Sequence, residues 1–218
     1  MEPDDVEIRV LGCLIEKQRT TPDAYPLTIN SLRLACNQST NRDPVVDYDE
    51  STIRAALERL GRRRWTRLAS WSGSRAMKYR HLLDDTLELT EPELALLGVL
   101  MLRGPQTPGE LKQRSERLHR FEGEEVERTL DSLTERELVK ALGRRPGQRE
   151  QRYVQRLGAD ADEDAAPGAV EPAPIAAESD APGPVAADPD LEQRVARLET
   201  ELDLLRREVG SLRTRLGD

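Results

Sequence analysis

Apolar side chains over the first 157 residues recur at helical spacing and then at strand spacing, and this order occurs twice. The helical stripes lie at 6–14, 29–36 and 53–60 in the first half, and the last helical stripe of the second half lies at 124–137. The strand-like runs lie at 65–71 and 76–82, and at 138–142 and 152–157. The pattern predicts three helices and a two-stranded hairpin in each half, a mainly α fold with small β-hairpins (α+β).

Matching motifs in the two halves indicate a duplication. Leu11-Gly12-Cys13-Leu14 recurs as Leu97-Gly98-Val99-Leu100, and Thr21-Pro22 recurs as Thr107-Pro108, both 86 residues on. Leu57-x-x-Leu60 recurs as Leu130-x-x-Leu133, only 73 residues on. We therefore expect the first copy to carry about a dozen extra residues between its second and third helices. Thr90-x-x-Glu93 and Thr107-x-x-Glu110 are capping-box patterns, which mark helix starts.

Three helices closed by a hairpin is the order of a winged helix. In that motif the third helix is the recognition helix and the hairpin turn is the wing. We expect two tandem winged-helix domains, at 1–83 and 84–157.

Several longer motifs carry a family resemblance. They are residues 11–18 with Thr20-Thr21-Pro22 and Tyr25-Pro26-Leu27, then residues 35–45, 102–111 and 145–150. In these motifs the chain resembles the YceH-like bacterial family over about residues 5–157. The resemblance implies a tandem winged-helix fold, a coiled-coil-like tail and a cytoplasmic location. It supplies no catalytic or ligand residues, because the function of that family is uncharacterised.

Charge is distributed unevenly along the chain. The net charge of −8 equals the eight acidic residues of 158–189, a segment with six prolines and no basic or aromatic residue. Such a composition cannot bury enough apolar surface to offset its chain entropy, so we expect a disordered acidic linker there. The preceding 157 residues carry a small positive charge, and an overall acidic pI therefore does not exclude a nucleic-acid partner.

The C-terminal segment 190–218 has a heptad pattern that predicts a coiled-coil oligomerisation helix. Its apolar positions alternate at spacings of four and three; they are Leu191, Val195, Leu198, Leu202, Leu205, Val209, Leu212 and Leu216. The g–e pairs expected in a parallel coil, such as Arg194 with Glu199, are all of opposite charge. Valine at a and leucine at d favour a homodimer, and a trimer stays open.

Catalytic chemistry has no support in the sequence. His81 and His119 have no Cys, Asp or Glu at metal-ligand or triad spacing, and no phosphate-binding or nucleophile motif occurs. Cys13 and Cys36 are best interpreted as small buried apolar residues in a reducing compartment. We expect a cytoplasmic protein that is not an enzyme, with no cofactor, metal, membrane segment or small-molecule substrate.

Nucleic-acid binding is the leading hypothesis, with duplex DNA as the expected partner. The candidate contacts are the arginines and lysine of the third helices and hairpins: Arg54, Arg59, Arg62, Arg63, Arg67, Arg75, Lys78, Arg144, Arg145, Arg149 and Arg152. Cations at a helix end and on a wing are where duplex phosphates would be contacted. The third helix of the second copy is acidic, so we expect the first copy to read DNA. The alternative is a protein–protein adaptor that uses the acidic helix as its docking face.

A dense polar cluster after the second helix has two interpretations. It comprises Asn37, Gln38, Asn41 and Arg42 with the hydroxyls of residues 39 and 40. Asn and Gln can pair bidentately with adenine, which would make the loop a recognition element. The same residues also form turns and cap helices, and we favour this structural role.

Overall fold

The computed structural model describes residues 2–69, 76–143 and 150–158. Within these ranges it is a mixed fold of seven α-helices and small antiparallel sheets, which confirms the predicted α+β class. The predicted coil at 190–218 and all of the predicted acidic linker except Gly158 lie outside the described residues. No helix within the described ranges is long and apolar enough to cross a bilayer.

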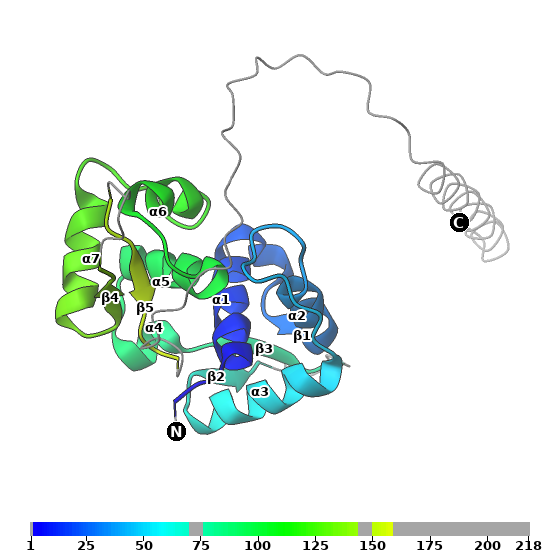
Figure 1. Ribbon diagram of the computed structural model, residues 1–218. Helices are drawn as coiled ribbons and strands as arrows, with labels where there is room; N and C mark the ends of the chain where they lie inside the picture. The colour runs from blue at the N-terminus through cyan, green and yellow to red at the C-terminus, as the bar shows by residue number, and fades with distance from the viewer. Residues whose placement is uncertain (1, 70–75, 144–149, 159–218) are drawn as a thin grey trace, which may run out of the picture. The chain divides into compact units, whose positions relative to one another are not determined.

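The first half contains three main helices and a three-stranded sheet (Figure 1). In chain order the elements are α1 (Asp5–Thr20), a 3-10 turn (Pro22–Ala24), β1 (Leu27–Thr28), α2 (Ile29–Cys36), α3 (Glu50–Arg62), β2 (Thr66–Leu68) and β3 (Lys78–His81). The strand order is β1-β3-β2, with Tyr79 of β3 opposite both Leu27 and Leu68. Polar side chains start each main helix: Asp4 caps α1, Thr28 caps α2 and Asp49 caps α3.

The second half repeats this order after a short connecting helix. Its elements are α4 (Leu83–Leu87), α5 (Glu91–Arg103), α6 (Pro108–Ser115), α7 (Glu125–Glu135), β4 (Val139–Ala141) and β5 (Tyr153–Gln155). The two strands pair antiparallel, and Gln106 forms a β-bridge to Tyr153 where the first half has β1. The capping box at Thr107 is confirmed: Glu110 accepts from the Thr107 backbone N–H at 2.8 Å and donates its own N–H to Oγ1 at 3.2 Å.

The duplication is visible in the element order, but part of the predicted alignment is wrong. Thr21 ends α1, where its N–H donates to Lys17, whereas Thr107 begins α6. The counterpart of Thr107 is Thr28, the N-cap of α2, which lies 79 residues earlier. The extra residues of the first copy are therefore divided between the α1–α2 and α2–α3 connections. The two Thr-Pro dipeptides are identical in sequence but not equivalent in structure, because Thr-Pro suits a helix start and a turn equally well.

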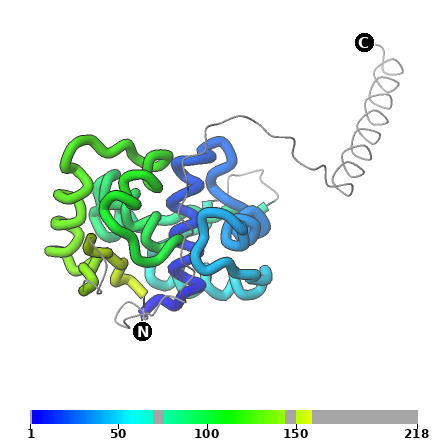
Figure 2. Tube along the Cα trace, turned by 45° about the horizontal axis from the view of Figure 1, so that its top comes forward, coloured from blue at the N-terminus to red at the C-terminus, as the bar shows by residue number. Residues whose placement is uncertain are grey.

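The core lies on both sides of α1, which packs against α2 and α3 of its own half and against α5 of the other (Figures 1 and 2). The two halves thus pack into one compact unit. Residues 7–15 of α1 are all buried, including the charged Glu7 and Arg9. Cys13 and Cys36 are free and buried in this core, as their interpretation as small apolar residues requires. A helix that is covered on all sides explains why α1 has no solvated polar face along this stretch.

Candidate nucleic-acid interface

The third helix of the first half, α3, presents one face to the core and one to solvent. Asp49 starts the helix by accepting from the Thr52 N–H at 2.7 Å. The buried stripe then follows the predicted period; it consists of Ile53, Ala56, Leu57 and Leu60. The opposite face is exposed and carries Arg54 and Arg62 together with Glu50 and Glu58. The helix therefore has both signs of charge on its outer surface.

Arg59 and Arg63, two predicted contacts on α3, are engaged within the fold. The Arg59 guanidinium lies 2.5 Å from a carboxylate oxygen of Asp4 and 3.0 Å from one of Glu7. Arg63 lies 3.5 Å from the other oxygen of Glu7, and its guanidinium also lies over the Trp65 ring. The bonds to Glu7 and Asp4 raise the pKa of Arg59. These two arginines tie the end of α3 to the start of α1, and 32% of the Arg59 side chain and 27% of the Arg63 side chain stay exposed.

The other predicted cations of the first half are open to solvent. Arg62 and Arg67 are exposed and make no ion pair within residues 2–69, 76–143 and 150–158. Arg54 pairs with Glu50 at 2.7 Å, but both side chains are about half exposed, so the pair is weak. Lys78 is half-buried on β3. Arg75, which the sequence pattern assigns to the wing, lies outside the described residues.

A groove of about 510 Å³ lies between α3 and the β2–β3 hairpin. It is lined by Arg54, Leu57, Glu58, Gly61, Thr66, Arg67, Leu68, Met77 and Tyr79. Its two cations come from different elements, Arg54 from α3 and Arg67 from β2. Leu68 and Met77 are each 53% exposed at its edge. The groove thus combines cations with accessible apolar side chains.

Among the residues that the structure describes, the hairpin of the second half carries fewer of the candidate contacts than the hairpin of the first half. Arg144, Arg145 and Arg149 lie outside the described residues. Arg152 sits 3.5 Å from Glu110, so its charge is partly met within the fold. On α7 the exposed face is dominated by carboxylates, among them Glu127, Asp131 and Glu135.

The polar loop after α2 makes the contacts of a structural element. Asn37 closes the loop, because its side chain donates to the Tyr48 carbonyl at 2.8 Å and accepts from the Tyr48 N–H at 2.9 Å. Arg42 is buried: its Nε donates to the Ala35 carbonyl, and its other nitrogens bond both oxygens of Glu16 and the Gln38 amide oxygen. Asn41 accepts a hydrogen bond from Arg103.

The two histidines contact neighbouring residues of their own half. His81 is buried and bonds Gln18 through Nε2 at 2.7 Å, and His119 packs edge-on against Phe121. Within the described ranges no group of three His, Cys, Asp or Glu side chains is arranged as a metal site.

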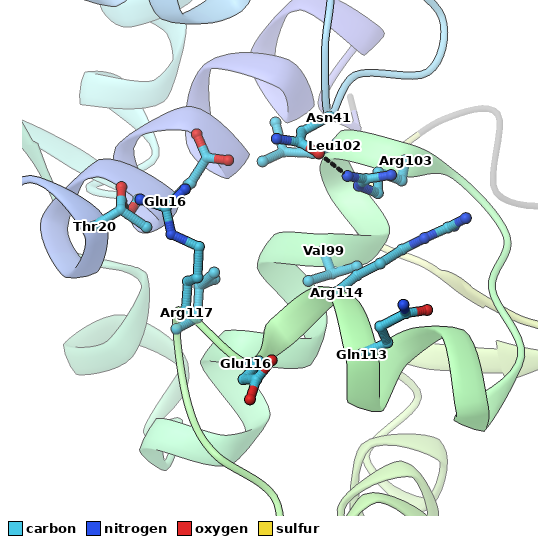
Figure 3. Close-up of a pocket in the computed structure, with 11 residues that line it drawn as sticks. Glu16, Thr20, Asn41, Val99, Leu102, Arg103, Gln113, Arg114, Glu116 and Arg117 are labelled. Atoms are coloured by element: carbon cyan, nitrogen blue, oxygen red, sulfur yellow. Dashed lines mark hydrogen bonds between the residues drawn. The ribbon is translucent and has the colours of Figure 1, made fainter. Parts of the chain in front are cut away.

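A second cavity, of about 540 Å³, lies between α1, α5 and α6 (Figure 3). It is lined by Glu16, Thr20, Asn41, Val99, Leu102, Arg103, Gln113, Arg114, Glu116, Arg117 and Leu118. No motif or charge cluster in the sequence marks its three arginines. Their convergence depends on the turn between α5 and α6 and on the packing of α1, and no spacing along the chain carries that information.

Comparison with known proteins gives matches over most of the chain. The model of a family described as a protein of unknown function, DUF480, matches residues 4–148. A UPF0502 protein of Azotobacter vinelandii is 52% identical over 154 residues, covering 70% of this chain and 68% of the relative. One of Pelobacter propionicus is 45% identical, covering 99% and 95%. The UPF0502 protein YceH of Salmonella paratyphi A is 40% identical, covering 97% and 96%.

Proposed function

The chain belongs to the DUF480 family and is similar to UPF0502 proteins, among them YceH, and we propose that it is a non-enzymatic, cytoplasmic regulator or nucleoid-type protein that binds duplex DNA. In this proposal each half is a winged helix. Support comes from the element order, in which a helix, a short strand or bridge, two helices and a hairpin occur twice.

The first half is the proposed reading head. A recognition helix needs an outer face that tolerates phosphates, and cations beside it to contact the backbone. The α3 helix provides Arg54 and Arg62, and the hairpin provides Arg67 and Lys78. The observation that carries the proposal is the exposure of Arg62 at the end of α3 and of Arg67 on β2, without carboxylate partners among the described side chains.

Arg59 and Arg63 take a supporting part in this proposal. Their bonds to Glu7 and Asp4 fix the end of α3 against α1, so they position the helix and do not contact phosphate. The acidic outer face of α7 would repel a duplex, so the second half is assigned no groove contact.

The C-terminal segment is proposed to bring two or three such chains together. A parallel coil at 190–218 joined through the acidic segment 158–189 would raise the effective concentration of one head once another is bound. A dimer is the favoured assembly and a trimer the alternative.

Protein–protein docking is the second candidate, and one observation favours it. Leu68 and Met77 are each 53% exposed beside the α3–hairpin groove, whose walls also include Leu57 and Tyr79. Accessible apolar side chains rimmed by charges suit a peptide partner better than a phosphate backbone.

Fluorescence anisotropy with a random-sequence duplex tests the proposal on the full chain. The double variant Arg62→Ala/Arg67→Ala should bind at least tenfold more weakly, since two phosphate contacts are lost. The control Lys112→Ala/Arg120→Ala removes two exposed cations of the second half and should leave affinity unchanged. Equal losses in both double variants would reduce the effect to net charge and contradict the assignment of the first half.

A further inference from the structure

The cavity between α1, α5 and α6 is lined by both polar and apolar side chains. Val99 and Leu102 of α5 and Leu118 after α6 supply the apolar lining. Its volume of about 540 Å³ lies within the range of small-molecule sites. Each wall comes from a different part of the chain, so the cavity exists only because the two halves pack together.

Three guanidinium groups face this space. Figure 3 shows Arg103 and Arg114 extending along one side of the cavity and Arg117 on the other, toward Glu16 and Thr20. Arg103 donates to the amide oxygen of Asn41, and Arg114 donates to that of Gln106. Both bonds use neutral acceptors, so neither removes a positive charge.

The carboxylates nearby do not balance these cations. Glu16, in the cavity wall, is already bonded to Arg42 at 2.6 Å and to Lys17 at 3.3 Å. Glu110 is shared between Arg114 at 3.4 Å and Arg152 at 3.5 Å. Glu116 is exposed and lies at the edge of the cavity away from Arg103. The space between Arg103 and Arg114 therefore has an excess of positive charge.

The excess of positive charge makes the cavity less stable when no anion is bound in it. Partial burial, followed by the charges of Arg114 and Arg42, lowers the pKa of Arg103, and the charges of Glu16 and Asp43 oppose this shift without cancelling it. A guanidinium whose charged form is penalised by its like-charged neighbours gains from any anion placed between them. Guanidinium groups also match the oxygens of phosphate bidentately.

We propose that this cavity binds a phosphorylated small molecule, with its phosphate between Arg103 and Arg114 and its organic part against Val99, Leu102 and Leu118. Arg117 and Gln113 lie where they can donate to further oxygens of the ligand. The site is independent of the α3 surface and of whether that surface binds DNA.

Isothermal titration calorimetry on the full chain, in phosphate-free buffer, tests this site. The probes are pyrophosphate and glucose 6-phosphate, with glucose as the uncharged control. At least one phosphorylated probe should bind, and glucose should not. In Arg103→Ala/Arg114→Ala the affinity should fall roughly 30-fold or more, because two charge-assisted hydrogen-bonding groups are lost. Arg128→Ala, which removes an exposed cation of α7, should bind as the wild type does.

Two readouts keep the result interpretable. The double variant should still unfold in one cooperative urea transition, although it loses the bonds to Asn41 and Gln106, and this transition establishes that its fold is intact. Absence of binding by both phosphorylated probes at millimolar concentration, or equal binding by a folded Arg103→Ala/Arg114→Ala, overturns the proposal. Displacement of the bound probe by duplex DNA also overturns it, since the cavity would then be a backbone-phosphate contact.

Discussion

Gly12 of α1 and Gly98 of α5 occupy equivalent positions in the two halves, and at each of them a side chain of the other half packs against the glycine. A Cβ on Gly12 would lie 2.9 Å from two side-chain carbons of Leu102. A Cβ on Gly98 would lie 2.9 Å from Cγ2 of Ile15. The repeated Leu-Gly-x-Leu motif therefore has a physical cause: both copies need a residue without a side chain where α1 and α5 cross.

Gly98→Ala should destabilise the protein by about 1–3 kcal/mol, because Ile15 is β-branched and cannot move aside without strain. Gly61→Ala is the matched control. Gly61 is exposed in α3, and a Cβ there would meet no atom within 4 Å. That substitution should stabilise the chain by roughly 0.5–1 kcal/mol, since alanine favours a helix. Urea unfolding measures both, and a Gly98→Ala variant as stable as wild type would contradict the close crossing.

The Arg42–Glu16 pair should be one of the most costly polar contacts to break. The Arg42 side chain is fully buried and bonds both Glu16 oxygens, at 2.6 and 3.1 Å. Removing one partner leaves the other charge buried, so Arg42→Ala should cost roughly 3 kcal/mol in unfolding free energy. Arg54→Ala breaks an exposed pair and should cost under about 0.5 kcal/mol. Similar losses in the two variants would show that the loop does not depend on this pair.

His81 should make stability depend on pH in mildly acidic solution. Burial lowers its pKa from 6.5 to about 4, against the opposing effect of Asp84 and with a smaller contribution from Arg80. Because the folded pKa is depressed, the unfolded chain binds a proton first as pH falls below about 6.5. Stability is full above that pH and is lost progressively toward pH 4, by about 3 kcal/mol in total.

The comparison that isolates this group is wild type against His81→Gln, each unfolded in urea at several values between pH 7 and pH 5. The variant should show a flatter dependence over that interval. Curves of the same slope would mean that His81 titrates alike in the folded and unfolded chains, contrary to its buried position.

The predicted coil gives a clear test of assembly. Changing Leu198 and Leu205, both expected at d positions, to glutamate should convert the oligomer to monomers by multi-angle light scattering. The control is the same pair changed to isoleucine or methionine, which keeps an apolar seam. A wild type that is already monomeric, or an assembly mass that glutamate does not change, contradicts the coil.

Local signals predicted the fold well. The apolar stripe of α3, the strand runs around Tyr79 and the capping box at Thr107 depend on neighbouring residues, and the structure has all three. Pairing across the chain was not predictable in the same way. Arg59 meets Asp4 across 55 positions, and no periodicity along the chain encodes that contact.

The same limit applies to the polar loop and the cavity. Asn37 and Arg42 have side chains that suit either recognition or loop closure, and only their contacts with Tyr48 and Glu16 distinguish the two roles. Arg103 ends α5, and only the packing of α1 beside α6 places it in a cavity with other cations.

The salt dependence of duplex binding tests the central proposal most directly. For the full chain on random duplex, the logarithm of affinity should fall linearly with the logarithm of salt between about 50 and about 200 mM, because phosphate contacts release counterions. In Arg62→Ala/Arg67→Ala the magnitude of that slope should fall by about two for each head engaged. No detectable binding at the lowest salt, or the same slope in wild type and variant, would contradict a duplex-binding surface on α3 and its hairpin.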